Sequence, residues 1–379
     1  MKAALLAAVV GLVVAGTAGR ALAYPQFTMT DGQTCTDCHS APAGGGQLNE
    51  YGQMFAEDLS KGDGNEAFLH GKWTPPSWLS LSGDVRFAAG ISGRGDYGPT
   101  VQPAIVPMQT ELNAVVKLAD PLTFHATAGL RGFNEEEPIK SFQVREHYVM
   151  LRQSPDDGRG AYARIGRFMA PYGLRLAEHP AYTRRYAGSN IFSETYGASV
   201  GWIGGQNEIH LTGFIHDRWL DTVERGDGGA LYAEHRFGDK AAIGLSARYA
   251  DARTEARTQL GMTAKLKLPS PGSLLQLQVD GIQQSLESQA GASYPDRNQL
   301  AAYLMASKRK GSWMAAFALG HYDENVDIKG LDRDAVDFNL HYFPWAHWEF
   351  ALTTRAQLLG QGDGGPLSGY ALLQAHYRL

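Results

Sequence analysis

From residue 77 to the C-terminus, apolar and polar residues alternate with a period of two. In the stretch 79–91 one face carries Leu79, Leu81, Val85, Phe87 and Ile91. The same alternation returns at 209–215, 260–268, 348–355 and 371–379. Because successive side chains of a strand point to opposite faces, the pattern predicts strands with one apolar and one polar face.

The connections between these strands are alternately short and long. Turn-forming residues make seven short links, at 120–121, 156–158, 204–205, 238–239, 269–272, 310–311 and 344–345. Longer polar stretches make eight loops, at 93–105, 133–139, 169–192, 218–229, 251–257, 287–298, 322–334 and 360–367. Fifteen connections of this kind predict sixteen strands. Because this number is even, the first strand begins and the last strand ends on the same side of the membrane.

Bacterial outer-membrane barrels have this organisation, with short periplasmic turns and long outer loops. We therefore expect a mainly β protein in which residues 77–379 form a 16-stranded antiparallel transmembrane β-barrel in the bacterial outer membrane. A soluble β-sandwich is the alternative, because its strands also alternate. A sandwich does not require short and long connections to take turns, so the barrel is the better interpretation.

Residues 24–76 show little strand pattern and form a separate, turn-rich segment. The run Gly44–Gly46 precedes a helix-like stretch at 47–59, whose apolar stripe consists of Leu48, Tyr51, Phe55 and Leu59. Two prolines in the stretch 72–76 make a stiff junction to the barrel. So short a segment has almost no core of its own, and its apolar stripe needs another surface to pack against.

Residues 1–23 have the features of a secretory signal peptide. Lys2 gives the positive start, residues 3–16 the apolar run, and Ala21-Leu22-Ala23 the small-residue cleavage site. After cleavage no run of 18 apolar residues remains, so we expect no transmembrane helix. The net charge of −5 is mildly acidic and argues against a nucleic-acid partner, which requires a basic face.

The strongest chemical signal is Cys35-Thr36-Asp37-Cys38-His39, a c-type haem attachment motif. Its two thiols can bond the two vinyl groups of one haem, and His39 then supplies the proximal axial ligand of the iron. Both cysteines of the chain lie in this motif. We expect one covalently bound haem c, with a simple disulfide or a thioredoxin-like redox pair as alternatives. The redox pair requires a βαβ context, which residues 30–60 do not supply.

The sixth ligand of the iron has three nearby candidates, Met29, Met54 and His70. Met54 is preferred as a possible distal ligand, because the stripe formed by Tyr51 and Phe55 brings its helix to the haem. Methionine would raise the reduction potential and histidine would lower it. An open sixth position and a ligand from the barrel lumen are the remaining alternatives.

The exported chain with this motif, followed by a barrel, resembles the fused monohaem cytochrome-porins of iron-oxidising bacteria. At the level of individual residues, the resemblance is confined mainly to residues 27–55. It rests on Phe27, Gly32, the haem motif, the glycine-rich gap and the run 48–55. The chain departs from the family at Thr28–Asp31, where Ala-Arg-Gln-Thr is usual, and at Gln53, where arginine is usual. The resemblance implies that Cys35 and Cys38 attach the haem and that His39 is its proximal ligand.

The resemblance also implies a function, namely electron transfer across the outer membrane from extracellular iron(II) to a periplasmic cytochrome or other electron carrier. If enzymatic, the protein would be an iron(II):cytochrome c oxidoreductase. Lipid hydrocarbon blocks electron transfer across the membrane. A haem joined to a barrel that crosses the membrane can exchange electrons with partners that it would not otherwise reach. A passive anion-preferring porin whose haem segment is a plug or sensor is one alternative. Outward electron transfer to extracellular metal, or to another redox substrate, is a second.

A second resemblance lies at residues 164–173, which look like the strand and inward-turning loop of phosphate-selective-type porins. It would place Arg175, Arg184 and Arg185 in the lumen, where they would favour anions. Construction common to many porins is the alternative. By strand parity the lumen also holds four histidines, namely His125, His210, His341 and His376.

Two acidic groups lie on expected outer loops. They are Glu135–Glu137 and the set Asp323, Glu324, Asp327, Asp332 and Asp334. Carboxylates accept iron(II), so these groups are candidates for recruiting it, although charged outer loops are also the default in such barrels.

Overall fold

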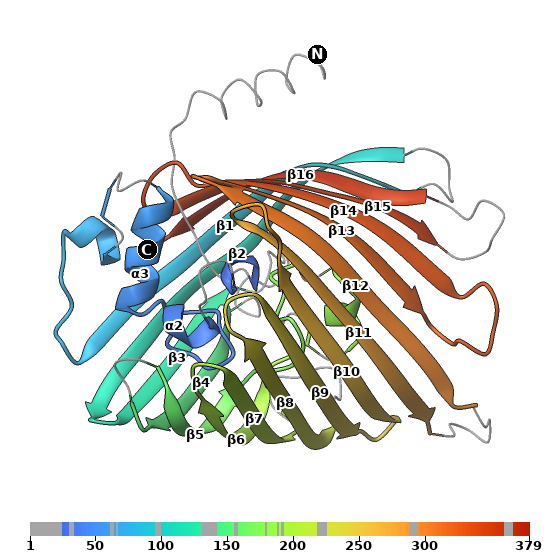
Figure 1. The fold of residues 1–379 in the computed structure, drawn as a ribbon, viewed down its shortest axis with the longest axis horizontal. Helices are drawn as coiled ribbons and strands as arrows, with labels where there is room; N and C mark the ends of the chain where they lie inside the picture. Colours follow the sequence, from blue (N-terminus) through green and yellow to red (C-terminus); the bar gives the residue numbers. More distant parts are fainter. Residues whose placement is uncertain are drawn as a thin grey trace, which may run out of the picture.

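The computed structural model describes residues 25–29, 34–60, 64–65, 67–94, 100–130, 142–154, 158–178, 180–187, 189–190, 193–217, 226–287, 295–359 and 367–379. Most of these residues belong to one β-barrel, and the remainder form an N-terminal segment of short helices and a long inward-folded connection (Figure 1).

The described residues form sixteen strands in one closed antiparallel barrel, in which each strand pairs with its neighbours in sequence and β1 pairs with β16. The strands are β1 Leu79–Arg94, β2 Thr100–Ala119, β3 Leu122–Leu130, β4 Phe142–Arg152, β5 Gly160–Phe168, β6 Thr195–Ile203, β7 Asn207–Ile215, β8 Asp227–Phe237, β9 Ala241–Asp251, β10 Glu255–Lys267, β11 Ser273–Leu286, β12 Arg297–Lys310, β13 Trp313–Asp323, β14 Asp332–Tyr342, β15 Trp348–Leu359 and β16 Leu367–Arg378. Closure leaves no sheet edge, so the backbone groups of the strands find partners within the barrel. The predicted strand number and fold class of the barrel are confirmed.

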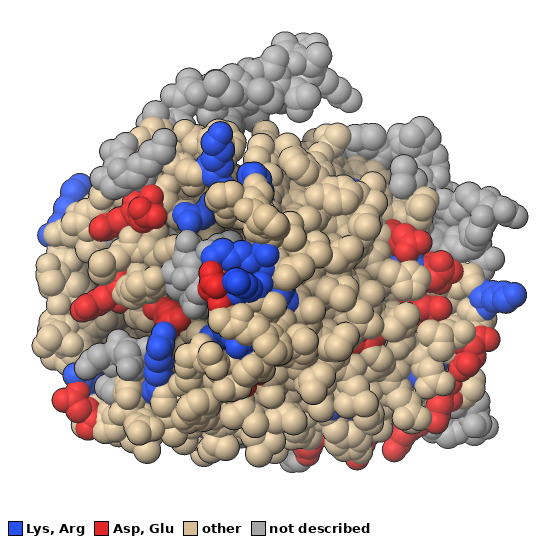
Figure 2. Space-filling view, viewed as in Figure 1, with Lys and Arg blue, Asp and Glu red and all other residues tan. Residues whose placement is uncertain are grey.

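The two faces of the strands differ as the alternation predicted. On β10 the outward Leu260 is 65% exposed, whereas the inward Lys265 is 4% exposed. Figure 2 shows charged residues in the left half and at the right-hand edge of the view, with a largely uncharged surface between them. An apolar outer band around a polar interior is the surface of a barrel that faces lipid. This surface agrees with the outer-membrane location predicted from the sequence.

The short turns of the barrel lie where the sequence predicted them. They include residues 120–121, 204–206, 238–240, 268–272, 311–312 and 343–347. One prediction about the loops is wrong, because β9 and β10 are joined by residues 252–254 alone. The polar residues taken for a longer loop instead extend the strands, and Glu255 and Arg257 pair across 3.2 Å at the start of β10.

The N-terminal segment contains η1 Pro25–Phe27, α2 Cys35–Cys38, α3 Glu50–Leu59 and η2 Phe68–Gly71. These helices lie at the left of Figure 1 and in front of the strands. No helix among the described residues is long and apolar enough to span a bilayer. The expected helix at 47–59 is present from Glu50 onward, with Asn49 accepting the N–H of Gly52 at 2.8 Å as its N-cap.

This segment is seated in the lumen at the end where the short turns lie. The hydroxyl of Ser312, in the turn between β12 and β13, donates to the carbonyl of Leu59 at 2.8 Å. Near the turn after β4, Arg152 Nη2 donates to the carbonyl of Ser40 at 3.0 Å. Short turns face the periplasm in barrels of this type, so the segment occupies the periplasmic side of the channel.

The apolar stripe of α3 is buried only in part. Leu48 and Leu59 pack with Phe27 and, from the barrel wall, with Met314 and Phe343. Tyr51, expected on the same stripe, is 45% exposed. The helix face that is buried consists of Gly52, Ala56 and Leu59, because α3 lies against both α2 and the barrel wall.

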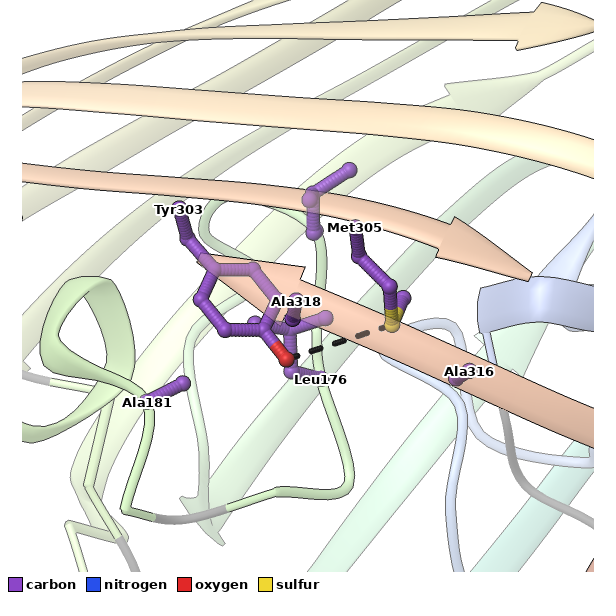
Figure 3. Packing of buried hydrophobic residues seen from close by; sticks show 7 residues of the cluster. Leu176, Ala181, Tyr303, Met305, Ala316 and Ala318 are labelled. Atoms are coloured by element: carbon purple, nitrogen blue, oxygen red, sulfur yellow. Dashed lines mark hydrogen bonds between the residues drawn. The ribbon is translucent and has the colours of Figure 1, made fainter. Parts of the chain in front are cut away.

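The connection from β5 to β6 folds into the lumen and contains α4 Tyr182–Arg185. Leu176 and Ala181 pack on Tyr303 and Met305 of β12 and on Ala316 and Ala318 of β13 (Figure 3). The N–H of Leu174 donates to Gln278 Oε1 of β11 at 2.8 Å. This connection therefore crosses the channel to the opposite wall, as expected of an inward-turning loop.

Candidate functional site

The motif Cys35–His39 forms a short, closed structure. Thr34 and Asp37 make a capping box, in which the N–H of Thr34 donates to Asp37 Oδ2 at 2.6 Å and the N–H of Asp37 donates to Thr34 Oγ1 at 3.2 Å. The single turn of α2 that follows carries Cys35 and Cys38 three residues apart, which is the spacing of neighbours on one helix face. Both carry free thiols and are half-buried.

The chain after the motif turns back on it through the glycine run. His39 and Leu48 form a β-bridge, and the N–H of Ser40 donates to the carbonyl of Gln47 at 3.0 Å. Between them Gly44 has a φ of +76°, and a Cβ there would lie 3.4 Å from the Cβ of Cys35. A residue with a side chain would be strained in this conformation, so glycine lets the chain pass closely over the motif.

The helix α3 approaches the motif equally closely at Gly52. A Cβ on Gly52 would lie 2.2 Å from the carbonyl oxygen of Cys38, so no side chain fits at this point. The N–H of Asn49 donates to that same carbonyl at 3.0 Å, and Asn49 Nδ2 donates to the carbonyl of Thr36 at 3.2 Å. These contacts hold α2 and α3 together as one unit.

This unit opens onto an internal cavity of about 290 Å³. Cys35, Cys38 and His39 all line it, so the structure brings the three principal predicted site residues together. Its apolar walls come from the N-terminal segment and the inward loop, namely Phe27, Leu48, Phe55, Tyr172 and Leu176. Two thiols on one helix face and an adjacent imidazole are the donor set that haem c requires. The apolar walls suit the faces of such a group.

The surroundings of the motif change the pKa values of Cys38 and His39. Burial, with added repulsion from the charge of Asp37, raises the pKa of the Cys38 thiol to about 12. Burial and the nearby charge of Arg378 lower the pKa of His39 to about 3. His39 is therefore held as the neutral imidazole, the form that binds metals.

The three nearby candidates for the sixth ligand do not line the cavity. Met54 is 65% exposed, and Met29 is buried elsewhere, against Ala242 and Leu274. His70 Nε2 lies 3.0 Å from the hydroxyl of Tyr377. The preference for Met54 assumed that the whole stripe of α3 faced the haem, whereas the face that carries Met54 points away from the packed side.

Two other methionines do line the cavity, Met108 of β2 and Met169 at the start of the inward loop. Both are far from the motif in sequence, and only the closure of the barrel brings them next to it. The signal for Met169 was present in the sequence, since it stands in the stretch 164–173 that predicted the inward loop.

The lumen histidines are buried in the wall, as parity predicted. His376 Nε2 lies 2.9 Å from Asp84 Oδ1, and His341 Nδ1 contacts Glu349 Oε1 at 2.5 Å. His376 Nδ1 is 3.3 Å from Glu349 Oε2, which joins the two pairs into one chain beside the cavity. His125 and His210 stack near Tyr148 and Tyr232 instead.

The arginines expected in the lumen have different surroundings. Arg175 pairs with the buried Glu208, and Arg184 lines the same cavity as the haem motif. Arg185 is exposed, with its guanidinium 5.6 Å from the centre of the Tyr186 ring. The inward position predicted for Arg175 and Arg184 is thus observed.

The acidic residues proposed to recruit iron form no metal cluster in the described part of the chain. Glu324 pairs with Arg297 and Arg333, and Asp334 pairs with His321. The other acidic group, Glu135–Glu137, lies outside the described residues. Partners of opposite charge are the ordinary arrangement of barrel loops, so these contacts identify no iron site.

Comparison with known proteins shows the fold of the barrel. No known protein family matches the sequence, and no curated protein matches it. Among solved structures, the anion-selective porin from Comamonas acidovorans is 12% identical, with a TM-score of 0.61 over 79% of this chain and 99% of that one. OprB of Pseudomonas putida is 10% identical, with a TM-score of 0.58 over 79% of this chain and 94% of that one.

The outer-membrane channel DcaP of Acinetobacter baumannii is also 10% identical, with a TM-score of 0.55 over 81% of this chain and 99% of that one. All three similarities cover nearly the whole of the other protein and leave about a fifth of this chain unmatched. At these identities they show a porin-like fold and nothing about the haem motif.

Proposed function

We propose that this protein is a porin-like barrel of the outer membrane that carries electrons through one covalently bound haem c held in its lumen. The observation that supports the proposal is that Cys35, Cys38 and His39 line a single cavity enclosed by the N-terminal segment, the inward loop and the barrel wall. Membership of the fused monohaem cytochrome-porin family, suggested by residues 27–55, is part of the same proposal.

In this proposal each part of the motif has one task. Cys35 and Cys38 would attach the haem through thioether bonds, and the neutral imidazole of His39 would supply a ligand to its iron. The walls formed by Phe27, Leu48 and Phe55 keep water from its faces. When bound, haem c supplies a one-electron iron(III)/iron(II) couple.

The position of the site also supports transfer across the membrane. A barrel of sixteen strands has a channel wide enough for an aqueous path. The N-terminal segment fills the end of this channel where the short turns lie, and Ser312 and Arg152 anchor it there. In this proposal a periplasmic carrier meets the motif at this end of the channel, and an extracellular donor reaches it through the lumen. We propose extracellular iron(II) as donor and a periplasmic cytochrome as acceptor.

The test is transfer across a membrane. The purified protein is reconstituted in liposomes that contain an oxidised dye, iron(II) is added outside, and the absorbance of haem and dye is followed. Haem reduction followed by dye reduction supports the proposal. A haem that stays oxidised, or equal dye reduction by a His39→Ala variant, overturns it. A strongly negative midpoint potential would instead favour outward transfer to extracellular metal.

A passive porin is the second candidate, and the comparisons favour it more directly, since the similar structures named above are porins and channels. In this case the N-terminal segment is a plug or sensor, and the solutes are anions drawn by lumen arginines such as Arg175 and Arg184. Single-channel conductance separates the candidates. A steady chloride current through the haem-loaded wild-type chain supports the porin, and a closed channel that still reduces the dye supports the electron carrier.

A further inference from the structure

The charged residues that line the cavity are mostly neutralised by partners. Arg145 pairs with Glu111 at 2.6 Å and with Glu194 at 2.5 Å. Arg378 pairs with Asp84 at 3.2 Å. Exchange of partners within such buried pairs is unfavourable, because a carboxylate left alone in a buried site is costly. We therefore expect Arg145 and Arg378 to keep these ion pairs within the barrel wall.

Two arginines of the cavity have a different environment, Arg86 of β1 and Arg184 of α4. Neither has a carboxylate within ion-pair distance in the part of the chain that the structure describes. Among the described residues, Arg86 contacts the imidazole of His376, whose Nδ1 lies 3.1 Å from Arg86 Nη2. An imidazole carries no negative charge, so this contact of Arg86 is not an ion pair.

The Nε of Arg86 is buried and finds no hydrogen-bond partner among the residues that the structure describes. A guanidinium has five N–H donors in a planar fork, and a buried donor without an acceptor costs free energy. This nitrogen therefore provides an unused donor on a side chain that lines the cavity.

Arg184 is held by neutral groups only. Its Nε donates to the carbonyl of Ser189 at 3.1 Å, and its Nη1 donates to the carbonyls of Leu176 and Ala177. Burial lowers the pKa of Arg184 to about 10, and repulsion from Arg145 and Arg86 adds to this effect while Glu178 opposes it. Arg86 and Arg184 line the cavity together with Arg145, whose charge is balanced by Glu111 and Glu194.

We infer that Arg86 and Arg184 form a binding site for a carboxylate inside the cavity, facing the haem motif. Arginine forms strong charge-assisted hydrogen bonds with carboxylates. Arg86 offers its unused Nε, and Nη2 of Arg184 makes none of the contacts described above, so the two side chains would hold one ligand between β1 and the inward loop. Glu146, which also lines the cavity, accepts the N–H of Met169 at 3.4 Å.

The carboxylate has two possible sources, the propionate groups of the haem and a free organic acid in the lumen. The first rests on the function proposed above, and the second does not. The same donor chemistry serves both, so the experiment has one arm for each source.

The first arm uses the haem-loaded full-length chain and the double variant Arg86→Gln/Arg184→Gln. Resonance Raman spectroscopy measures the propionate bending band, which reports hydrogen bonds to those carboxylates. We expect the band to shift in the double variant and to stay unchanged in the control Arg297→Gln. Arg297 loses the same charge but pairs with Glu324 at 2.9 Å, away from the cavity.

The second arm uses the haem-free chain Cys35→Ala/Cys38→Ala and measures succinate binding by calorimetry. A free-acid source predicts that Arg86→Gln/Arg184→Gln weakens binding by about tenfold or more, because hydrogen bonds to charged groups are strong. Either result supports the carboxylate site and identifies its source. An unmoved propionate band together with unchanged or absent succinate binding overturns it.

The two proposals fail separately. If the wild-type chain takes up no haem, the proposed electron transfer fails, and the succinate arm alone decides the carboxylate site. Barrel folding of every variant is checked by the shift in gel migration between heated and unheated samples. A variant that does not fold is replaced by the single substitution Arg184→Lys, which keeps the charge and removes the fork, and is expected to weaken binding by a smaller factor.

Discussion

The guanidinium of Arg175 donates through Nη1 to the carbonyl oxygen of Pro42 at 3.2 Å. This contact joins the inward loop to the N-terminal segment directly after the haem motif. The same side chain pairs with the buried Glu208 of β7 and lies 4.7 Å from the centre of the Tyr232 ring. One residue thus ties the segment, the loop and the wall together.

Replacing Arg175 with methionine should destabilise this assembly. The substitution removes the contact to Pro42 and one of the two arginines that neutralise Glu208, the other being Arg236. Breaking a buried ion pair costs about 3–5 kcal/mol, and the remaining arginine reduces this to about 2–3 kcal/mol. Urea unfolding in lipid vesicles measures the loss.

The control for this prediction is Arg297→Met, whose half-exposed pair with Glu324 should contribute at most about 1 kcal/mol. Equal losses in the two variants would show that the link through Arg175 has no special role.

Gly52→Ala should lower covalent haem attachment. The added Cβ would lie 2.2 Å from the carbonyl oxygen of Cys38, so α3 must move away from α2 and the motif opens. The measurement is the haem absorbance per mole of purified chain. Gly281→Ala on β11 is the matched control, because nothing lies within 4 Å of a Cβ at that position. Full haem content in Gly52→Ala would mean that close packing of α3 is not needed.

Met54→Leu should leave the reduction potential of the haem unchanged. The side chain is 65% exposed and does not line the cavity. Met169→Leu, by contrast, changes a residue of the cavity wall and is expected to shift the potential. Potentiometric titration of the two variants decides this. A shift with Met54→Leu and none with Met169→Leu would support Met54 as the distal ligand.

Leu260→Arg should destabilise the barrel through its lipid-facing surface. Leu260 is 65% exposed in the middle of β10. A charged side chain near the bilayer midplane costs about 2–4 kcal/mol. Folding into vesicles measures this cost, with Leu260→Met as the control that keeps an apolar side chain of similar volume. If arginine folds as well as methionine, this face of β10 does not meet lipid.

The barrel was predictable because each strand repeats the same local rule. Side chains such as Glu208 and His210 point inward and Ile209 outward by parity alone, and turn-forming residues mark the strand ends. The connection 252–254 shows the limit of the method, because polar residues at the mouth of a barrel belong equally to a loop or to the end of a strand.

The motif was predictable from five consecutive residues, whereas its surroundings were not. The cavity depends on how residues from β1, β2, the inward loop and β16 meet inside a closed barrel, and no local pattern encodes this. Met169 and Arg86 line the cavity for this reason, although they are far from Cys35 in sequence. The exposure of Tyr51 has a related cause, since the barrel wall and α2 together determine which face of α3 is buried.

The central claim is that Cys35 and Cys38 hold one haem covalently inside this barrel. Intact-mass spectrometry of the mature protein, purified from a host that matures c-type cytochromes, tests it most directly. We predict a mass increased by one haem per chain, retained after acid–acetone extraction and lost in Cys35→Ala/Cys38→Ala. A wild-type chain with the mass of the polypeptide alone, in a folded barrel, would contradict the account and leave the porin.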